Sequence, residues 1–279
     1  MDKTLILITC TDKVGLVALI SRILADHKLN IIAMREFVDT GSCTFFTRIE
    51  CHGALDDCTE IHRELEEHLP AQASIIINPK KEKRLAIMVT REYHCLGDTL
   101  VRHFFNTLHA NVCCVIGNYN DLEAFTTQFS IPFYHISHKD KTKEAFEGEL
   151  LSVLSSYQPD FIVLAKFMRI LSPQFIQEYP MRIINIHHSF LPAFVGAKPY
   201  KQAFDRGVKL LGATAHFVTN DLDEGPIIAQ QTLHVNHTFG VADMVISGKE
   251  IEKAVLSKAL QLVLEDRVFV AGNKTIVFE

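Results

Sequence analysis

The sequence lacks any run of about eighteen apolar residues, the length that a membrane-spanning helix needs. Its first residues, MDKTLILITCTDKVG, also lack the apolar stretch and the flanks of a secretory signal peptide. It has no excess of basic charge, because 28 basic and 33 acidic residues give a formal net charge of -5 and the basic residues are scattered. These absences predict a cytoplasmic protein whose partners include neither nucleic acid nor a membrane.

The seven cysteines form no CxxC pair. Their number is odd, and Cys113 and Cys114 are adjacent in an apolar run, so buried free thiols are favoured over disulfides. Tight metal-binding patterns such as HExxH are also missing, and we expect no metal. A metal-dependent hydrolase stays open as an alternative because four residues have the right ligand chemistry: His187, His188, His216 and Asp223.

The composition, with 48% hydrophobic and 22% charged residues, is typical of a packed globular protein. The chain length of 279 residues suits one domain of about 190 residues and another of about 80. The stretch NPKKEKR at residues 78–84 places a proline and five charges between apolar segments and reads as a linker. We therefore expect a first domain over residues 1–80 and a second over residues 85–279.

The first domain alternates between strand and helix patterns in the order βαββαβ. This order predicts a ferredoxin-like layer of one sheet under two helices. The expected ranges are 5–10, 14–24, 31–38, 43–51, 57–69 and 73–77.

The second domain alternates strands with longer helices, which predicts a doubly wound α/β fold with a mostly parallel sheet. Ligands of such sheets bind beyond the carboxyl ends of the strands. The expected strands are 85–89, 112–116, one near 133, 161–165, 182–186, 210–218 and 227–235. The expected helices are one ending near 108, one near 122–129, 142–157 and 241–266.

The strand at 182–186 leads into HHSFLP and carries two polar side chains at its carboxyl end. Asn185 and His187 are two residues apart, so they project to the same side of a strand. There, Asn185 can donate a hydrogen bond to a carbonyl oxygen while His187 moves a proton, a geometry suited to acyl transfer. A structural histidine and a turn-capping asparagine are the alternative interpretation.

The polar segment TNDLDEGP at residues 219–226 separates the last two predicted strands. It offers Asp221, Asp223 and Glu224 beside a Gly-Pro turn. Most such clusters are ordinary loops. A carboxylate that folds back to His187 would hold the imidazole in one tautomer and help to position water.

Three sequence blocks occur in a recognisable order: FMRILSP, then INIHHSFLPAF with its continuation VGAKPY, then NDLDEGPII. In order and spacing they resemble the folate formyltransferase family, which includes glycinamide ribonucleotide transformylase. The resemblance implies that Asn185, His187 and Asp223 are catalytic. The residues that it implies for a pterin pocket are Met168, Arg169, Ile170, Leu171 and Asp221.

Two departures from the transformylase pattern bear on the acceptor of the formyl group. His188 stands where the transformylase usually has proline, and the glycine- and serine-rich phosphate loop is replaced by REYHCLGD at residues 91–98. A bulky loop that carries Asp98 is a poor nest for a phosphate dianion. We therefore expect water as the acceptor and hydrolysis of 10-formyltetrahydrofolate as the reaction, with folate as substrate and no bound cofactor. A formyltransferase with an amine acceptor such as glycinamide ribonucleotide is the alternative.

Residues 1 to about 78 resemble the ACT domain, a regulatory module that often binds amino acids, and TDKVGL resembles its ligand loop. The resemblance implies an amino-acid effector near Asp12 and Gly15. Gly15 allows close approach of a ligand at a helix start, whose dipole favours a carboxylate. Because ACT domains tend to pair, the resemblance also implies a homo-oligomer. A plain strand-to-helix turn, and a sensor without catalytic activity, are the alternatives.

Overall fold

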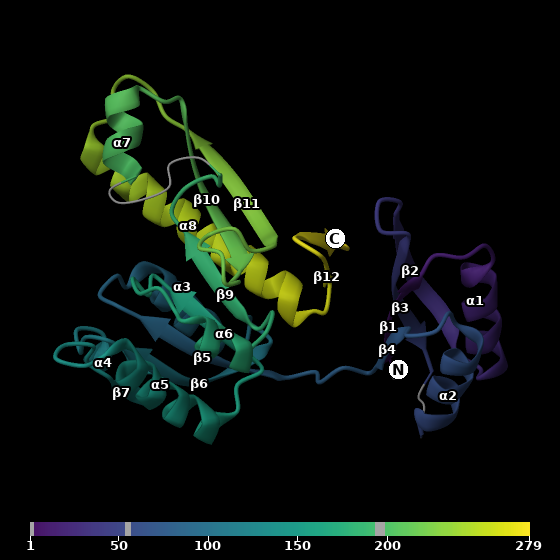
Figure 1. The fold of residues 1–279 in the computed structure, drawn as a ribbon. Helices are drawn as coiled ribbons and strands as arrows, with labels where there is room; N and C mark the ends of the chain where they lie inside the picture. The colour runs from purple at the N-terminus through teal and green to yellow at the C-terminus, as the bar shows by residue number, and fades with distance from the viewer. Residues whose placement is uncertain (1–2, 54–56, 193–198) are drawn as a thin grey trace. The chain divides into compact units, whose positions relative to one another are not determined.

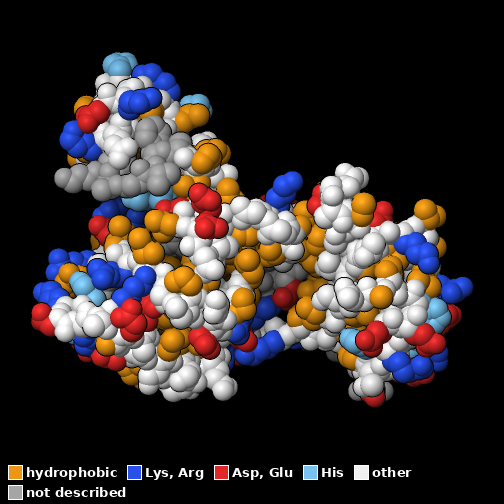
Figure 2. Space-filling view, viewed as in Figure 1, with side chains coloured by type: hydrophobic (Ala, Val, Ile, Leu, Met, Phe, Trp, Pro, Cys, Tyr) orange, Lys and Arg blue, Asp and Glu red, His pale blue; other side chains and the backbone are white. Residues whose placement is uncertain are grey.

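The computed structural model describes residues 3–53, 57–192 and 199–279. The chain folds into two compact units (Figure 1). One comprises Met1–Lys81 with Asp266–Phe269 and Ile276–Glu279, and the other comprises Glu82–Glu265 with Val270–Thr275. Among the described residues, no helix is long and apolar enough to cross a membrane. On the face drawn in Figure 2, acidic and basic side chains are interspersed rather than gathered into a basic stripe.

The first unit has the expected βαββαβ order and forms an antiparallel sheet with strand order β2-β3-β1-β4. This confirms the predicted ferredoxin-like arrangement. Its elements are β1 (Lys3–Thr11), α1 (Leu16–Asp26), β2 (Asn30–Asp39), β3 (Thr44–His52), α2 (Thr59–His68) and β4 (Ser74–Ile77).

One apolar stripe from each helix closes the core of the first unit. Helix α1 buries residues at helical spacing against alternate residues of β1, and α2 adds Ile61 and Leu65. Helix α1 begins at Leu16, two residues later than predicted, because Gly15 before it has a left-handed backbone with a φ of 92°.

The end of the chain also belongs to the first unit. Phe269 packs edge-to-face on Phe46 with ring centroids 5.9 Å apart, and Arg48 Nε donates to the Asp266 carbonyl oxygen at 3.1 Å. Phe269 lies on a hairpin of β12 (Val268–Ala271) and β13 (Lys274–Val277), which was not among the strands expected from the sequence.

The second unit contains a seven-stranded sheet with strand order β11-β10-β9-β8-β5-β6-β7. The five strands from β9 to β7 are parallel, whereas β10 and β11 run antiparallel at one edge. This confirms the predicted mostly parallel α/β fold. The strands are β5 (Lys83–Val89), β6 (Ala110–Gly117), β7 (Phe133–His135), β8 (Phe161–Ala165), β9 (Ile183–His187), β10 (Leu210–Phe217) and β11 (Ile227–His234).

Helices cover both faces of this sheet. Residues 85–89 of β5 are all 0% exposed, which requires packing on both sides of the strand. Phe146 of α5 and Phe175 of α6 belong to the cluster on one face, while α8 packs along β10 and β11 and contacts α3. The helices are α3 (His94–Phe104), α4 (Glu123–Thr127), α5 (Lys143–Tyr157), α6 (Pro173–Glu178), α7 (Pro199–Arg206) and α8 (Val241–Leu264).

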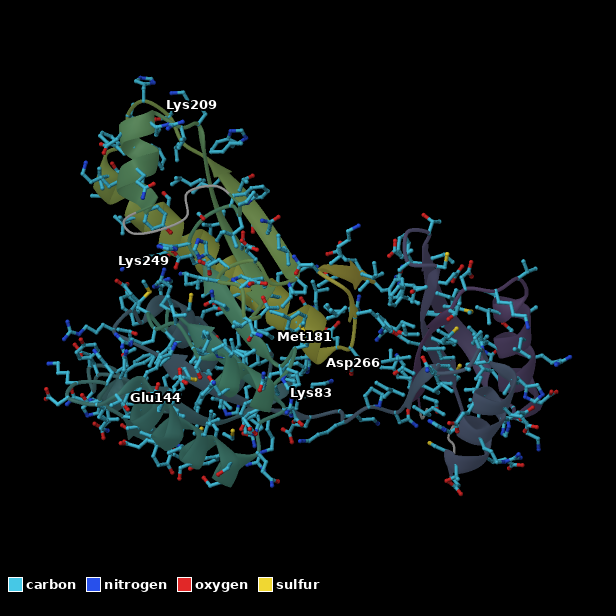
Figure 3. The ribbon with its side chains drawn as sticks, viewed as in Figure 1. Lys83, Glu144, Met181, Lys209, Lys249 and Asp266 are labelled. Atoms are coloured by element: carbon cyan, nitrogen blue, oxygen red, sulfur yellow. The ribbon has the colours of Figure 1, made fainter. Side chains whose placement is uncertain are left out.

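The boundaries differ from the predictions at a few places. Strand β5 begins at Lys83, inside the predicted linker, and Lys83 Nζ is buried where it donates to the Leu264 carbonyl oxygen at 2.8 Å (Figure 3). Helix α3 ends at Phe104 rather than near residue 108. Helices α6 and α7 were not predicted, and residues 193–198 of the HHSFLPAFVGAKPY block lie outside the described residues.

The turn between β10 and β11, at residues 218–226, is tight, and its two ends are joined by a backbone hydrogen bond. Phe217 N donates to the Pro226 carbonyl oxygen at 2.9 Å, and Asp223 has a left-handed backbone with a φ of 58°. A Cβ atom at Gly225 would lie 1.8 Å from the Phe217 carbonyl oxygen, so only glycine fits there without a backbone shift. The turn therefore depends on Gly225 to bring Asp223 back over the sheet.

Replacement of Gly225 by alanine should destabilise the second unit by roughly 1–3 kcal/mol, the usual cost of overpacking. Gly148, on the exposed side of α5, is the control position, because a Cβ atom added there would have nothing within 4 Å. Gly148→Ala should stabilise by about 0.5–1 kcal/mol through helix propensity. Urea unfolding of both variants measures the two effects. Equal midpoints for the two variants would contradict the steric argument.

Candidate active site

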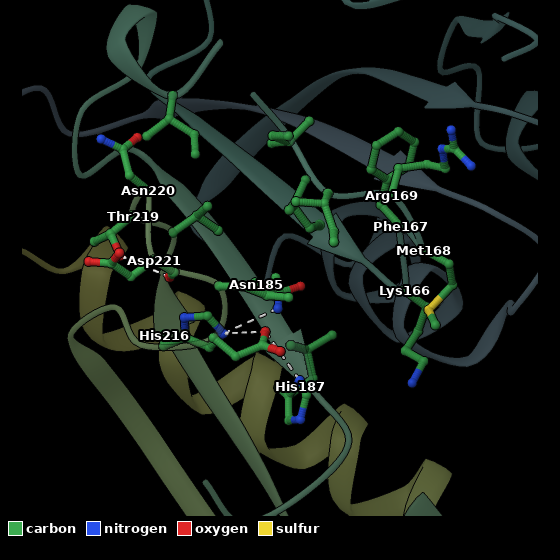
Figure 4. Close-up of a pocket in the computed structure, with 18 of the residues that line it drawn as sticks. Lys166, Phe167, Met168, Arg169, Asn185, His187, His216, Thr219, Asn220 and Asp221 are labelled. Carbon is green, nitrogen blue, oxygen red and sulfur yellow. Dashed lines mark hydrogen bonds and ion pairs between the residues drawn. The ribbon is translucent and has the colours of Figure 1, made fainter. Parts of the chain in front are cut away.

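The carboxyl ends of β8 and β9 border a cavity of about 460 Å³ in the second unit (Figure 4). Asn185 and His187 enter it from the end of β9, and His216 enters from β10, where it lies opposite Asn185 in the antiparallel register. Asp223 reaches the same cavity from the β10–β11 turn. The position agrees with the rule that ligands bind beyond the carboxyl ends of parallel strands.

The three residues that the sequence resemblance implied as catalytic come together here. His187 Nδ1 lies 3.3 Å from Asp223 Oδ1, and Asn185 Nδ2 lies 3.2 Å from His216 Nε2. His216 Nε2 is in turn 3.7 Å from Asp223 Oδ1. His216 therefore links the amide to the carboxylate, a role that was not predicted from the sequence.

The two imidazoles keep Asp223 ionised. The hydrogen bond with His187, followed by the closeness of the His216 ring, lowers the pKa of Asp223 well below its ordinary value, although burial acts in the opposite direction. Both short contacts involve Oδ1, and within the described residues Oδ2 has no such contact with an imidazole. That oxygen is left to accept a hydrogen bond from water or a ligand.

The ring of His187 has one engaged nitrogen and one free nitrogen. Nδ1 faces Asp223, whereas Nε2 is buried without a hydrogen-bond partner in the described part of the chain. An unsatisfied buried nitrogen is costly in a purely structural residue and is common where a ligand or water supplies the partner. His188, beside it, has its pKa lowered to about 4, first by burial and then by the Lys166 ammonium, so it is neutral at pH 7.

The residues proposed for a pterin pocket all line this cavity. Met168 and Ile170 are 60% and 62% exposed, so they are not core residues as their apolar character alone would suggest. Arg169 is exposed and has no ion-pair partner among the described residues, and Leu171 is buried beneath the segment. Asp221 lines the opposite wall, in the turn that carries Asp223.

A second cavity of about 400 Å³ adjoins the first, and residues 168–171 line both. Its wall includes the amino end of α5 with the basic residues Lys141 and Lys143, and Glu147 from the same helix. Glu147 accepts hydrogen bonds from the Ser172 amide and hydroxyl groups. Arg169 thus stands between the two cavities.

A separate buried cluster adjoins the cavity behind Lys166. Glu252 of α8 is 1% exposed and accepts from His94 Nε2 at 2.8 Å and from the Tyr200 hydroxyl. Lys166 Nζ lies 3.2 Å from the same carboxylate, and Lys166 itself lines the cavity. These residues were not predicted from the sequence, since they come from four distant segments.

Within the described residues, three side chains of this cluster lie close enough together to bind a metal ion. Ligand atoms of His94, Cys95 and Glu252 lie within 4.8 Å of one another. A cation there would compete with the Lys166 ammonium for the Glu252 carboxylate, and burial raises the pKa of the Cys95 thiol, which disfavours the thiolate that metals bind.

The predicted effector loop of the first unit lies between β1 and α1. Gly15 precedes α1 with no side-chain cap, so the first backbone N–H groups of the helix are not satisfied by a capping side chain. Asp12 is exposed, and its own amide donates to the Cys43 carbonyl oxygen at 2.7 Å. The loop thus presents a carboxylate beside uncapped amide donors.

Comparison with protein families gives a match to the formyl transferase model over residues 83–260. Among curated proteins, the chain is 46% identical over 277 residues to a formyltetrahydrofolate deformylase of Haemophilus influenzae, covering 99% of each chain. It is 41% identical to the protein of the same name from Bacillus subtilis, covering 99% of this chain and 94% of that protein.

Solved structures give the same result. A formyltetrahydrofolate deformylase from Pseudomonas syringae pv. tomato superposes with a TM-score of 0.93 at 42% identity, covering 99% of this chain and 94% of that one. Glycinamide ribonucleotide transformylase 1 from Symbiobacterium toebii superposes with a TM-score of 0.68 at 28% identity, covering 72% of this chain and 96% of that one.

The lowered pKa of Asp223 makes a prediction for stability. A carboxylate with a depressed pKa stabilises the fold above its unfolded pKa of about 4, and this stabilisation is lost as the pH falls through the lowered folded value. Asp223→Asn should therefore reduce the free energy of unfolding at pH 7 by about 1.5–3 kcal/mol, the range for hydrogen bonds to charged groups. The difference from the parent should narrow below pH 4. Urea titrations at pH 7, 5 and 3 test this, and a difference that does not change with pH would refute it.

Proposed function

This chain belongs to the formyl transferase family, and from that premise we propose that it hydrolyses 10-formyltetrahydrofolate to formate and tetrahydrofolate. The observation that carries the proposal is the meeting of Asn185, His187 and Asp223 at one cavity, from the end of β9 and a distant turn. The identity of 41–47% to formyltetrahydrofolate deformylases over nearly the whole chain supports the same reaction.

The proposed mechanism uses the observed contacts. The Asp223 carboxylate orients and polarises a water, His187 takes its proton, and the resulting imidazolium is stabilised by the carboxylate 3.3 Å away. Asn185 Nδ2 has two N–H bonds, so it can bind His216 and still donate to the oxyanion that forms on the formyl carbon. The carbon–nitrogen bond then breaks, the folate nitrogen takes up a proton, and formate leaves.

The cavity walls suit a folate. The exposed side chains of Met168 and Ile170 offer apolar surface for a pterin ring, and Asp221 offers an acceptor for its N–H groups. Arg169 and the basic edge of the neighbouring cavity can hold the carboxylates of the glutamate tail. Folate is thus the substrate, and the proposed chemistry needs no further cofactor.

Residues 91–98 were predicted to form the first loop of the second unit, but α3 begins at His94, so only residues 91–93 precede the helix. The side chains of this segment support water as the acceptor. Arg91 stacks on Tyr119 with the guanidinium carbon 3.9 Å from the ring centroid, and Glu92 pairs with Lys249 Nζ at 2.6 Å. Asp98 pairs with Arg102 within α3 at 2.7 Å. A segment that carries two acids and whose side chains are already engaged is a poor cradle for the phosphate of a nucleotide acceptor. Transfer to an amine such as glycinamide ribonucleotide remains the alternative.

We propose that the first unit binds an amino acid and that the chain forms a homo-oligomer. The amino-acid carboxylate would accept from the first amides of α1, and Asp12 would accept from its ammonium group. Strand β2 is an edge of the sheet over ten residues, and its outer backbone groups offer a surface for a second copy.

Incubation with formyltetrahydrofolate and no added acceptor tests the reaction. We expect formate in an amount equal to the formyltetrahydrofolate consumed, whereas a transferase would release none.

Asp223→Asn should lower kcat by about 10²–10⁴ while the Kd for tetrahydrofolate stays within about threefold. Arg169→Met should instead raise KM. Asp205→Asn, which alters an exposed acid paired with Lys201 on α7, is the matched control. Formate release by Asp223→Asn at the parent rate would refute the assignment.

Calorimetric titration with glycine and methionine tests the effector site. At least one of them should bind, and Asp12→Asn should weaken that binding by about tenfold or more. Asp26→Asn, which removes an exposed acid at the other end of α1, should leave the binding unchanged. Light scattering on the same samples gives the number of subunits. An affinity for the amino acid that is the same in the Asp12→Asn variant would place the effector elsewhere.

A further inference from the structure

The buried cluster behind the cavity holds an ammonium in a fixed place. Lys166 follows β8 directly, is 8% exposed and has a left-handed backbone with a φ of 62°. Its Nζ lies 3.2 Å from the buried Glu252 carboxylate, and Lys166 is one of the residues round the cavity in Figure 4. A buried ammonium and carboxylate are costly to desolvate, and a well-packed apolar pair is often at least as stable, so the charges are not explained by stability alone.

Glu252 is itself fixed by donors from two further elements. His94 at the start of α3 donates from Nε2 at 2.8 Å, and the Tyr200 hydroxyl of α7 donates to the second oxygen. Burial acts to raise the pKa of Glu252, but the His94 hydrogen bond, the Lys166 charge and the Tyr200 hydrogen bond outweigh it and lower the pKa to about 2. The carboxylate is therefore ionised throughout the neutral range, and it anchors the ammonium.

The proposed hydrolysis needs positive charge that the other residues of the site do not fully supply. Negative charge develops on the formyl oxygen, and the product is an anion, yet Asp223 already places a carboxylate in the cavity. One of the two N–H bonds of the Asn185 amide points to His216 Nε2, so only the other can donate to a ligand. His188 is neutral at pH 7, and Arg169 lies on the exposed rim. Lys166 is the buried cation among the described residues that line the cavity.

We propose that Lys166, positioned by Glu252, is a further catalytic residue that donates a hydrogen bond to the oxyanion of the formyl group and to the formate product. An ammonium has three N–H bonds, and among the described residues its ion-pair partner is Glu252, so donors remain for a ligand oxygen. Glu252 is a positioning residue that acts through Lys166. This inference rests on the proposed formate-releasing reaction and adds a second donor to Asn185.

Steady-state formate release, with added formate as inhibitor, tests the proposal in the full-length protein. Lys166→Met should lower kcat by about 10²–10³, change KM by less than about threefold and weaken formate inhibition about tenfold. Lys166→Arg, which keeps the charge, should retain more kcat than Lys166→Met. Glu252→Gln should shift kcat and formate inhibition in the same direction by a smaller factor, because the ammonium remains but is less well fixed.

Lys253→Met is the matched control. Lys253 lies on α8 next to Glu252 in sequence, pairs with Glu250 at 2.7 Å and is not among the residues that line the cavity. Its replacement should leave kcat and formate inhibition unchanged.

Three results would overturn the proposal: parental kcat and formate inhibition in Lys166→Met, equal losses in Lys166→Met and Lys166→Arg, or a loss confined to KM. If Lys166→Met does not fold, the Lys166→Arg and Glu252→Gln variants test the proposal instead. Formate inhibition at the parental level in Glu252→Gln would then also overturn the proposal. A parent protein that releases no formate would instead refute the proposed function. Calorimetric binding of formate to the parent and to Lys166→Arg would then still test whether this cavity holds the anion.

Discussion

The contact between a carboxylate from a turn and an imidazole at a strand end is the constraint on which the site depends. His187 is fixed by the parallel sheet, but Asp223 reaches it only because the β10–β11 turn folds back over the sheet. That return requires the close approach of Gly225 to the Phe217 backbone and a left-handed Asp223. The backbone of the turn, rather than the acid alone, therefore creates the contact between His187 and Asp223 to which we assign proton transfer.

Two carboxylates of the second unit, the partly buried Asp223 and the buried Glu252, have surroundings that give them different tasks. Asp223 is bound by imidazoles through one oxygen and presents the other to the cavity, which suits contact with water. Glu252 is saturated by His94, Lys166 and Tyr200 and is 1% exposed, which suits a fixed counter-charge. One carboxylate thus faces the cavity, and the other holds the Lys166 ammonium beside it.

Local sequence patterns were sufficient for the features that depend on neighbouring residues. The alternation of strands and helices predicted both folds, and the two-residue spacing of Asn185 and His187 predicted their common side. Helices α6 and α7 were missed; they begin at Pro173 and Pro199, inside sequence blocks that were interpreted as parts of the site rather than as helices. His216 and Glu252 were missed for a different reason: their contacts arise from antiparallel register and helix packing, which no local pattern encodes.

The chain is similar both to deformylases and to transformylases, and we propose that groups other than Asn185, His187 and Asp223 select the acceptor. The transformylase structure covers 72% of this chain, so its likeness extends over most of the second unit, where Asn185, His187 and Asp223 lie. Activation of a nucleophile and stabilisation of an oxyanion serve water and an amine equally. Selectivity must then come from groups that admit or exclude the acceptor. In this chain residues 91–94, which lead into α3, contact Tyr119, Lys249 and Glu252 through their side chains. We propose that this segment takes up the space that an amine acceptor would need, which leaves water as the nucleophile.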